Sequence, residues 1–431
     1  MIAKSEYPMH SEYKASGYDW IGEVPAHWSV EKLGNCLSAV SLKGRPDLPL
    51  LSITRESGVI ERDVDDQESN HNFIPEDLSN YKVLRAGQFG MNKMKAWQGS
   101  YGISAHTGIV SPAYFVFDVV HEVDPEFFNQ ALRSKLYVSY FAAASDGVRI
   151  GQWDLSKTRM RDIPVVLPPI REQRVIANYL REKCANIDEA VRIKEEQIDL
   201  LRERLQALVQ EVATRGLNPD APLKESGIDG IGQIPTHWKV RRNFVLFREV
   251  KVSGRADLPV LSVSIHDGVS AEELSDEANI RSINKIEDRT AYKEVLCGDI
   301  AYNMMRAWQG GIGAVSVHGM VSPAYVVARP TSDLIANYFE LLYRCPAFIH
   351  QMDRASKGIT DFRKRLYWDD FKNLLTVVPP RDEQARIVEH LGDLSATTEA
   401  AISLKKEQVT RLKDYRTCLI NAAVTGKIKV S

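Results

Sequence analysis

The residues best suited to bind another molecule occur in two similar segments, one in each half of the chain. Each segment places amide and cationic side chains around a tryptophan, Trp97 or Trp308. Lysine and arginine can donate to guanine O6 and N7 in the major groove of DNA, and asparagine and glutamine can pair with adenine. The sequence therefore predicts base-reading side chains at Asn92, Lys93, Lys95 and Gln98, and again at Asn303, Arg306 and Gln309.

A structural interpretation of the same residues competes with this one. Trp97 and Trp308 could belong to a hydrophobic core, which is the stronger interpretation for these two residues, and Asn92 and Asn303 could tie a turn. The two segments also differ, because the position of Lys93 is taken by Met304 in the second segment. A difference at a reading position would give the two segments different preferences.

A second set of basic residues lies downstream in each half. Contacts from such residues to phosphates would provide affinity and salt dependence without reading sequence. Neighbouring aspartates dilute both clusters, so a solvated face of mixed charge is an equally good interpretation. The predicted phosphate contacts are Arg149 and Lys157 in the first half, and Arg363, Lys364 and Arg365 in the second.

The sequence contains no recognised catalytic motif. It lacks a Walker A loop, a GxGxxG fingerprint, an HExxH pair and a GxSxG elbow. The five cysteines are scattered and predict reduced thiols, and no metal-ligand cluster or bound cofactor is expected. His27 and His237 precede tryptophans in matching motifs and are interpreted as structural. A binding module is favoured; the alternatives are a methyltransferase or nuclease with an unrecognised site, or a coiled-coil adaptor.

Length and charge set further bounds. The chain has 431 residues, enough for about two or three domains with their own cores. A net charge of −2 still allows DNA binding, because the field at a groove is set locally. No signal peptide is evident and no apolar run reaches the roughly 18 residues of a membrane helix. We therefore expect a cytoplasmic protein.

An internal duplication organises the whole chain, with a period of about 211 residues. The unit is much longer than a solenoid repeat, so the sequence predicts a doubled domain. The recurring motifs are Ile21-Gly-Glu-Val-Pro-Ala-His-Trp28 and Ile231-Gly-Gln-Ile-Pro-Thr-His-Trp238, Gly44-Arg-Pro-Asp-Leu-Pro49 and Gly254-Arg-Ala-Asp-Leu-Pro259, and Val110-Ser-Pro-Ala-Tyr114 and Val321-Ser-Pro-Ala-Tyr325.

Each unit ends in a heptad pattern. Apolar residues from Ile187 to Val212 are spaced alternately four and three residues apart, and a weaker copy runs from Thr398 to Ala423. These patterns predict two helices of roughly 40 Å that pack antiparallel in one chain. Lys194 and Lys405 interrupt the two seams at the same place. They could fix the register, or their side chains could extend out of the seam.

The predicted fold is α+β, with two similar recognition domains joined by two long antiparallel coiled-coil helices around a pseudo-two-fold axis. A separation of roughly 40 Å would be close to one turn of DNA, about 34 Å. We expect strands at 50–53, 114–117, 260–263 and 325–327, and helices at about 125–144 and 332–352. A short amphipathic helix should start near 171 and 381, before each long helix. The predicted domains are a first recognition domain at 1–168, a helical region at 169–215, a linker with the second recognition domain at 216–378, and a second helical region at 379–431. The linker itself is expected at 215–232.

These features resemble the specificity subunit of a type I restriction-modification system. The resemblance covers nearly the whole chain and is specific as a combination of motifs. It rests on Pro168-Pro169 with Glu172-Gln173, Pro379-Pro380 with Glu383-Gln384, the helical regions after them, and Asn-x-Met-Lys/Arg-Ala-Trp-Gln-Gly and Val-Ser-Pro-Ala-Tyr in each unit.

The resemblance implies a function and partners. Each globular domain would read one half of a bipartite, non-palindromic site on double-stranded DNA, and the helices would set the spacer. The subunit would have no catalytic activity. It would recruit two methyltransferase subunits that use S-adenosylmethionine, and two motor-nuclease subunits that use ATP and Mg²⁺ would complete the enzyme. The family has no fixed reading motif, so the predicted DNA-binding residues depend on their chemistry alone.

Overall fold

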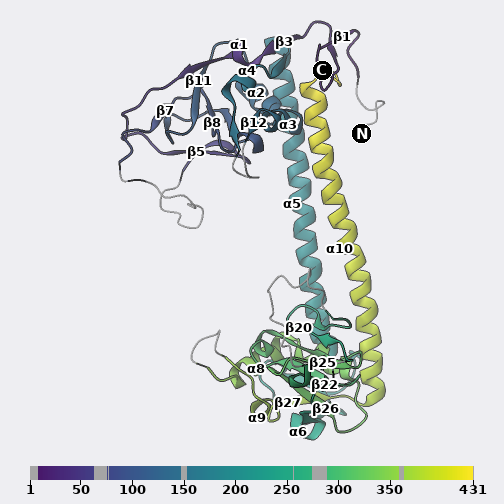
Figure 1. Cartoon of the computed structure of the whole chain (residues 1–431). Coiled ribbons are helices and arrows are strands. Elements are labelled where there is room, and N and C mark those ends of the chain that lie inside the picture. The colour runs from purple at the N-terminus through teal and green to yellow at the C-terminus, as the bar shows by residue number, and fades with distance from the viewer. Residues whose placement is uncertain are drawn as a thin grey trace. The chain divides into compact units, whose positions relative to one another are not determined.

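The computed structural model describes residues 8–62, 75, 77–146, 153–255, 257–273, 289–358 and 364–430. It divides into two compact units (Figure 1). Unit 1 comprises the chain up to Glu195 together with the segment from Lys406 onward, and unit 2 comprises Glu196–Lys405. Each unit therefore contains a globular domain and part of both long helices, α5 (Ile170–Arg215) and α10 (Arg381–Val424).

The domain of unit 1 is built on a four-stranded antiparallel sheet in the order β4-β11-β8-β9. Helices α2 and α3 pack on this sheet and bury aromatic side chains such as Phe89, Tyr101 and Phe128. The strands are β1 (Tyr13–Ala15), β2 (Glu23–Pro25), β3 (Ser29–Lys32), β4 (Leu37–Val40), β5 (Leu51–Thr54), β6 (Gly58–Glu61), β7 (Lys82–Leu84), β8 (Phe89–Met91), β9 (Tyr101–Ile103), β10 (Gly108–Val110), β11 (Phe115–Val119), β12 (Ser145–Asp146), β13 (Asp154–Leu155) and β14 (Pro164–Leu167). The helices are α1 (Leu33–Cys36), the 3-10 helix η1 (Ala96–Gln98), α2 (Pro125–Leu132), α3 (Lys135–Ala143) and α4 (Lys157–Arg161).

Unit 2 repeats this arrangement, which confirms the duplication inferred from the sequence. Its four-stranded sheet has the corresponding order β18-β26-β23-β24 and packs against α7 and α8. The strands are β15 (Leu223–Glu225), β16 (Gln233–Pro235), β17 (Lys239–Arg242), β18 (Phe247–Val250), β19 (Val260–Leu261), β20 (Val263–Ser264), β21 (Gly268–Val269), β22 (Lys293–Val295), β23 (Ile300–Asn303), β24 (Ile312–Ala314), β25 (Gly319–Val321), β26 (Tyr325–Pro330) and β27 (Leu375–Val378). The helices are α6 (Asn243–Leu246), η2 (Arg289–Ala291), η3 (Ala307–Gln309), α7 (Ala336–Tyr343), α8 (Pro346–Ala355) and α9 (Trp368–Phe371).

Three expectations about local structure need correction. The helices expected at 125–144 and 332–352 are each two helices, broken at Ser134 and at Cys345. Cys345 precedes Pro346, and the proline ring disfavours a helical conformation at the residue before it. The short helices expected near 171 and 381 do not exist separately, because α5 and α10 are continuous from their first turns. The expected linker 215–232 contributes β15, and its Ile228 is buried in the core of unit 2.

A paired motif fastens the start of each long helix to its domain. The carboxylate of Glu172 accepts hydrogen bonds from Trp28 Nε1 (2.9 Å) and contacts His27 Nε2 (2.7 Å). Gln173 is buried and accepts from the backbone N–H of Asp124 (2.8 Å). Because Trp28 is fully buried, its indole N–H needs such an acceptor.

The same contacts recur in unit 2. Glu383 accepts from Trp238 Nε1 at 3.0 Å and contacts His237 Nε2 at 2.8 Å. The repeated Pro-x-His-Trp and Pro-Pro-x-x-Glu-Gln motifs are therefore two halves of one structural contact. This agrees with the structural role predicted for both histidines.

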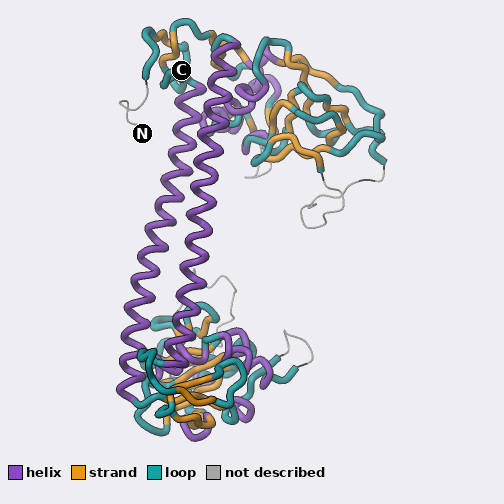
Figure 2. The backbone as a smooth tube through the Cα atoms, turned by 180° about the vertical axis from the view of Figure 1, so that it is seen from behind, coloured by secondary structure: helices purple, strands orange, loops and turns teal. Residues whose placement is uncertain are grey.

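Within unit 1, the first half of α5 lies beside the last half of α10 in both views (Figures 1 and 2). Asp188 pairs with Arg416 at 3.3 Å, and Glu195 pairs with Lys413 at 3.1 Å. The residue numbers of these pairs increase along α5 and decrease along α10. The two helix segments are therefore antiparallel in this unit. Their seam buries residues of the predicted heptads, including Ile187, Val191, Val409, Leu419 and Ala423.

In unit 2 the seam buries Ile198 and Ile402. Lys405, one of the two interrupting lysines, is half-buried and donates from Nζ to Gln197 Oε1 at 2.7 Å. Its ammonium group thus has a hydrogen-bond partner on the other helix, as a register-setting residue would need. None of the helices in the described ranges is both long and apolar enough to cross a membrane.

Candidate nucleic-acid interface

The predicted reading segment of unit 1 forms a tight turn after β8. Asn92 is buried, and its side chain accepts from Met94 N (3.2 Å) and donates to the Tyr114 hydroxyl (3.0 Å). In unit 2, Asn303 accepts from Met305 N in the same way at 3.0 Å. The asparagines therefore tie the turn, as the structural interpretation proposed. Their amides hold the backbone on which the neighbouring side chains are displayed.

The two tryptophans of these turns are not core residues, so the core interpretation was wrong. Trp97 and Trp308 are half-buried, and Ala96 and Ala307 beside them are fully buried. Because the small alanine occupies the core position of each turn, the adjacent indole is left at the surface of the domain. Each indole N–H donates to a backbone carbonyl of its own turn, at 3.1 Å in unit 1 and 2.9 Å in unit 2.

The turn of each unit is joined to the downstream basic segment by a backbone hydrogen bond. Leu155 N donates to Lys93 O at 3.0 Å, and Leu366 N donates to Met304 O at 2.8 Å. The structure thus brings together the two groups of residues that the sequence analysis predicted separately. Trp97 lies against Trp153, with ring centroids 5.3 Å apart.

The predicted cations of unit 1 have different surroundings. Lys95 is exposed at the tip of the turn, and Gln98 is half-buried behind it. Lys93 pairs with Asp154 at 2.9 Å. Lys157 is exposed on α4, with its ammonium 5.9 Å from the centre of the Phe115 ring. Arg149 lies outside the described residues.

In unit 2, Arg306 is exposed and donates to Gln309 Oε1 at 2.7 Å. Lys364 pairs with Asp353 at 2.7 Å, and its ammonium lies 5.1 Å from the centre of the Trp308 ring. Arg365 is half-buried and forms a backbone bridge to Lys357. Arg363 lies outside the described residues. The ion pairs of both units agree with the alternative interpretation, a solvated face of mixed charge. Lys95, Lys157 and Arg306 are the exposed cations of this face.

Sequence reasoning missed Lys43 and Lys82, which form a lysine cluster in unit 1 together with the predicted Lys93 and Lys157. Lys82 donates from Nζ to the Tyr114 carbonyl at 2.6 Å. Its pKa is lowered, first by burial and then by the positive charges of Lys43, Lys157 and Lys93. Lys43 and Lys82 form an isolated β-bridge, a contact between distant segments that leaves no local sequence signal. We call these four residues the lysine cluster.

Unit 2 keeps only the central member of the lysine cluster. Lys293 donates to the Tyr325 carbonyl at 2.6 Å, as Lys82 does to Tyr114. The positions of Lys43, Lys93 and Lys157 are occupied by Ser253, Met304 and Trp368. Burial lowers the pKa of Lys293, the nearby carboxylate of Glu249 raises it, and the positive charge of Lys251 lowers it. The two domains therefore share a backbone arrangement but differ in charge at equivalent sequence positions.

Comparison with known proteins shows which proteins this chain resembles. No family model matches the chain. It is 20% identical to the putative type I restriction enzyme MjaX specificity subunit of Methanocaldococcus jannaschii, over 95% of this chain and 96% of the relative. It is 22% identical to the EcoKI specificity subunit of Escherichia coli K12 (75% and 68%) and 24% identical to the EcoBI specificity subunit (70% and 65%).

Two solved structures share the fold. A chain from a study of complex assembly and conformational transition of a type I R-M system aligns with a TM-score of 0.66 at 16% identity, over 93% of this chain and 98% of the other. The HsdS subunit of Thermoanaerobacter tengcongensis aligns with a TM-score of 0.54 at 17% identity, over 97% and 100%. The chain is therefore similar in sequence to type I restriction enzyme specificity subunits, over nearly its full length in one case, and the two solved structures show that it shares their fold.

Proposed function

We propose that this chain is the DNA-recognition subunit of a type I restriction-modification complex, with each globular domain reading one half of a bipartite, non-palindromic site. The observation that carries the proposal is the pair of like domains with unlike side chains at matched positions. Lys93 and Lys157 of unit 1 correspond to Met304 and Trp368 of unit 2. Domains that bound one identical half-site would need the same side chains at these places.

Unit 1 offers two kinds of contact. The lysine cluster supplies several positive charges around Lys82, which suits the closely spaced phosphates of a DNA strand. Lys95 lies exposed in the neighbouring turn, where Asn92 and the backbone hold it in place. We assign phosphate contacts to the cluster and base contacts to Lys95 and Gln98, because an amide or ammonium on a rigid turn can reach base edges.

Unit 2 makes the equivalent contacts with different groups. Arg306 is exposed, and the hydrogen bond to Gln309 orients its guanidinium group. Arginine can contact guanine O6 and N7 through two parallel hydrogen bonds. Trp308 and Lys364 lie beside it, with an ammonium-to-ring distance of 5.1 Å. We assign the reading role in this unit to Arg306 and Gln309, and backbone contacts to Lys364 and Arg365.

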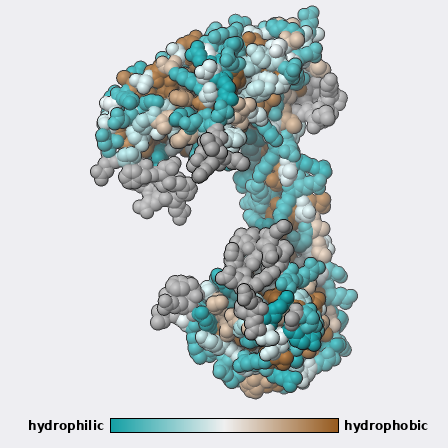
Figure 3. All heavy atoms as spheres, in the orientation of Figure 1, coloured by the Kyte–Doolittle hydropathy of each residue, from teal (hydrophilic) through white to brown (hydrophobic). Residues whose placement is uncertain are grey.

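The long helices have a different role in the proposal. We propose that α5 and α10 pack antiparallel along their length, set the spacer between the half-sites, and dock the methyltransferase subunits. The antiparallel pairing within unit 1 supports the first part. In the space-filling view, hydrophilic residues predominate on the visible face of the helices, with some apolar residues among them (Figure 3). Ile193 and Leu404, at equivalent positions of the two helices, are 39% and 61% exposed and are candidate docking residues.

The catalytic work belongs to partner subunits in this proposal. Two methyltransferase subunits would bind S-adenosylmethionine, and two restriction subunits would use ATP and Mg²⁺. The chain itself provides recognition without catalysis. Its curated relatives are described as specificity subunits, which favours neither a methyltransferase or nuclease with its own active site nor a coiled-coil adaptor.

The adenine methylation pattern of cells tests the proposal directly. The chain would be expressed with its methyltransferase partner, and modified adenines would be mapped by single-molecule sequencing. We expect a split motif with unlike halves and one modified adenine in each half. A palindromic motif, or no motif from a complex shown to assemble, would contradict it. Lengthening both helices by about four residues, roughly one turn, should lengthen the spacer and leave both halves unchanged.

A further inference from the structure

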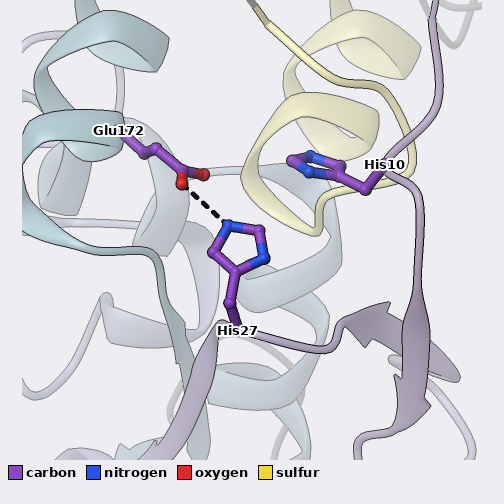
Figure 4. A group of neighbouring side chains, drawn as sticks. All are labelled: His10, His27 and Glu172. Carbon is purple, nitrogen blue, oxygen red and sulfur yellow. Dashed lines mark hydrogen bonds and ion pairs between the residues drawn. The ribbon is translucent and has the colours of Figure 1, made fainter.

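Three side chains with metal-binding atoms converge in unit 1, outside the proposed DNA interface. His10 precedes β1, His27 follows β2, and Glu172 lies in the first turn of α5. One ligand atom from each lies within 4.8 Å of the others. Figure 4 shows the two imidazole rings and the carboxylate around a common space. The three residues come from separate segments, so no motif in the sequence indicates them.

The carboxylate of this group is already oriented. Glu172 Oε1 lies 2.7 Å from His27 Nε2, and its Oε2 accepts from the buried indole N–H of Trp28 at 2.9 Å. In metal sites, a ligating carboxylate is commonly held by such a second hydrogen bond, which fixes its direction. Because Trp28 occupies Oε2, Oε1 is the atom left to face the two imidazoles.

His10 provides the clearest sign of a missing partner. Its Nε2 atom is buried and has no hydrogen-bond partner. Buried polar atoms in proteins are nearly always paired, so an unpaired nitrogen on a ring that lies beside two other ligand groups points to a partner that is not a protein group. The ring also packs against His27 and Trp28, with centroids 5.5 and 5.6 Å away.

The charges around His10 are compatible with a divalent cation. The groups that face its imidazole are the carboxylate of Glu172, the ring of His27, the ammonium group of Lys429 and the backbone of Ile428. Lys429 is the unfavourable neighbour, and the carboxylate of Glu172 opposes its charge.

We propose that His10, His27 and Glu172 bind Zn²⁺, with water at a fourth position. Two imidazoles and one carboxylate form a set that zinc uses in proteins, at about 2.0–2.2 Å from the metal. Closing the group onto one ion requires His27 to exchange its hydrogen bond with Glu172 for a shared metal. Because His27 is 48% exposed on its side chain, the ring has room to make this small movement and water has access to the fourth position.

The ion would fasten distant parts of unit 1 together. Pro8, two residues before His10, accepts a hydrogen bond from Lys429 N at 2.8 Å, and the Tyr13 hydroxyl donates to Gly426 O at 3.0 Å. The segment holding His10 thus already contacts the segment that follows α10. Zinc would tie both segments to the start of α5, in addition to the Glu172–Trp28 contact.

Unit 2 provides an internal control. It repeats the His237–Glu383 contact at 2.8 Å and the Trp238–Glu383 bond at 3.0 Å. However, Asp220 takes the position of His10 in unit 2. Among the described residues, no second group of three His, Cys, Asp or Glu side chains brings its ligand atoms this close together. The duplicated contact therefore lacks its third ligand in unit 2, and a single zinc ion per chain is expected.

Zinc titration of the full-length chain tests the proposal. The parent, His10→Gln and His237→Gln would be stripped with a chelator and titrated with Zn²⁺ by calorimetry, and Co²⁺ would replace Zn²⁺ to give an absorption spectrum that reports coordination. We expect one equivalent bound by the parent and by His237→Gln, with affinity at least ten-fold lower in His10→Gln.

A thermal melt in chelator checks that His10→Gln folds as the parent does without metal. Added Zn²⁺ should then raise the melting temperature of the parent and of His237→Gln but not that of His10→Gln. The proposal is overturned if the stripped parent binds no zinc, or if His10→Gln binds it with the affinity and the cobalt spectrum of the parent.

Discussion

Removing charge from the lysine cluster should reduce the salt dependence of DNA binding by a calculable amount. Lys43 and Lys157 are the exposed members of the cluster, and both act on the pKa of the central Lys82. If each neutralises one phosphate, each contributes about −0.9 to the slope of log affinity against log salt concentration. The double variant Lys43→Gln/Lys157→Gln should therefore have a slope shallower by about 1.8.

The same reasoning gives the expected change in affinity. Raising the salt concentration from about 50 to about 200 mM lowers the affinity of both proteins for DNA. With two contacts removed, the fold-decrease in the variant should be about twelve times smaller than the fold-decrease in the parent. The change should be similar for specific and unrelated duplexes, because phosphate contacts carry no sequence information. Both side chains are exposed, so the free energy of unfolding should change by no more than about 0.5 kcal/mol for each substitution.

The assay is fluorescence anisotropy of a labelled duplex carrying the split motif, titrated with the assembled methyltransferase complex at several salt concentrations. Lys135→Gln is a control for the loss of an exposed lysine, because Lys135 lies at the start of α3 and is not a member of the lysine cluster. An unchanged slope in the double variant, with a normal thermal melt, would refute the assignment of the lysine cluster to phosphates.

Further predictions concern Arg306, Glu383 and the cysteines. Arg306→Ala should relax the methylated motif at one base of a single half-site, at a cost of about 1–3 kcal/mol in affinity, and methylome mapping would detect this; a motif altered in both halves would argue against the assignment. Glu383→Ala should destabilise the chain by about 1–3 kcal/mol in urea unfolding, because it leaves the buried Trp238 N–H without an acceptor; no change in midpoint would contradict this. Burial raises the pKa of Cys345 to about 12, so at pH 8 a thiol reagent should modify the exposed Cys297 and spare Cys345. Because the unfolded thiol of Cys345 ionises near its ordinary pKa of 9.0, the stability contributed by its burial should be fully present below pH 9 and fall as the pH rises towards 12, which pH-dependent unfolding would measure.

Local patterns in the sequence were sufficient to predict most of the elements. Regular apolar spacing from Ile187 onward predicted α5, because a helix returns to the same face every three or four residues. The ends of β14 and β27 agree with the proline pairs that follow them, since proline cannot continue a strand ladder. The same reasoning failed at Ser134 and Cys345, where apolar residues continue on both sides of a break in the helix.

Only tertiary structure decided which side chains meet. Trp97 was expected in the core, but the turn at η1 gives the core position to Ala96, and no propensity distinguishes these adjacent residues. Lys43 and Lys82 pair across strands, and His10 meets Glu172 from a distant segment, so neither contact has a sequence spacing that could reveal it.

The amino-acid sequence by itself determined that the chain is doubled, that each unit ends in a long heptad helix, and that equivalent positions of the two units differ. These properties depend on residues near one another in the chain or on comparison of one half with the other. The tertiary structure decided how the cations are grouped, because side-chain proximity depends on strand pairing and packing rather than on order along the chain. The clearest result of that grouping is the lysine cluster of unit 1, of which unit 2 keeps Lys293, with Lys251 and Glu249 as its charged neighbours.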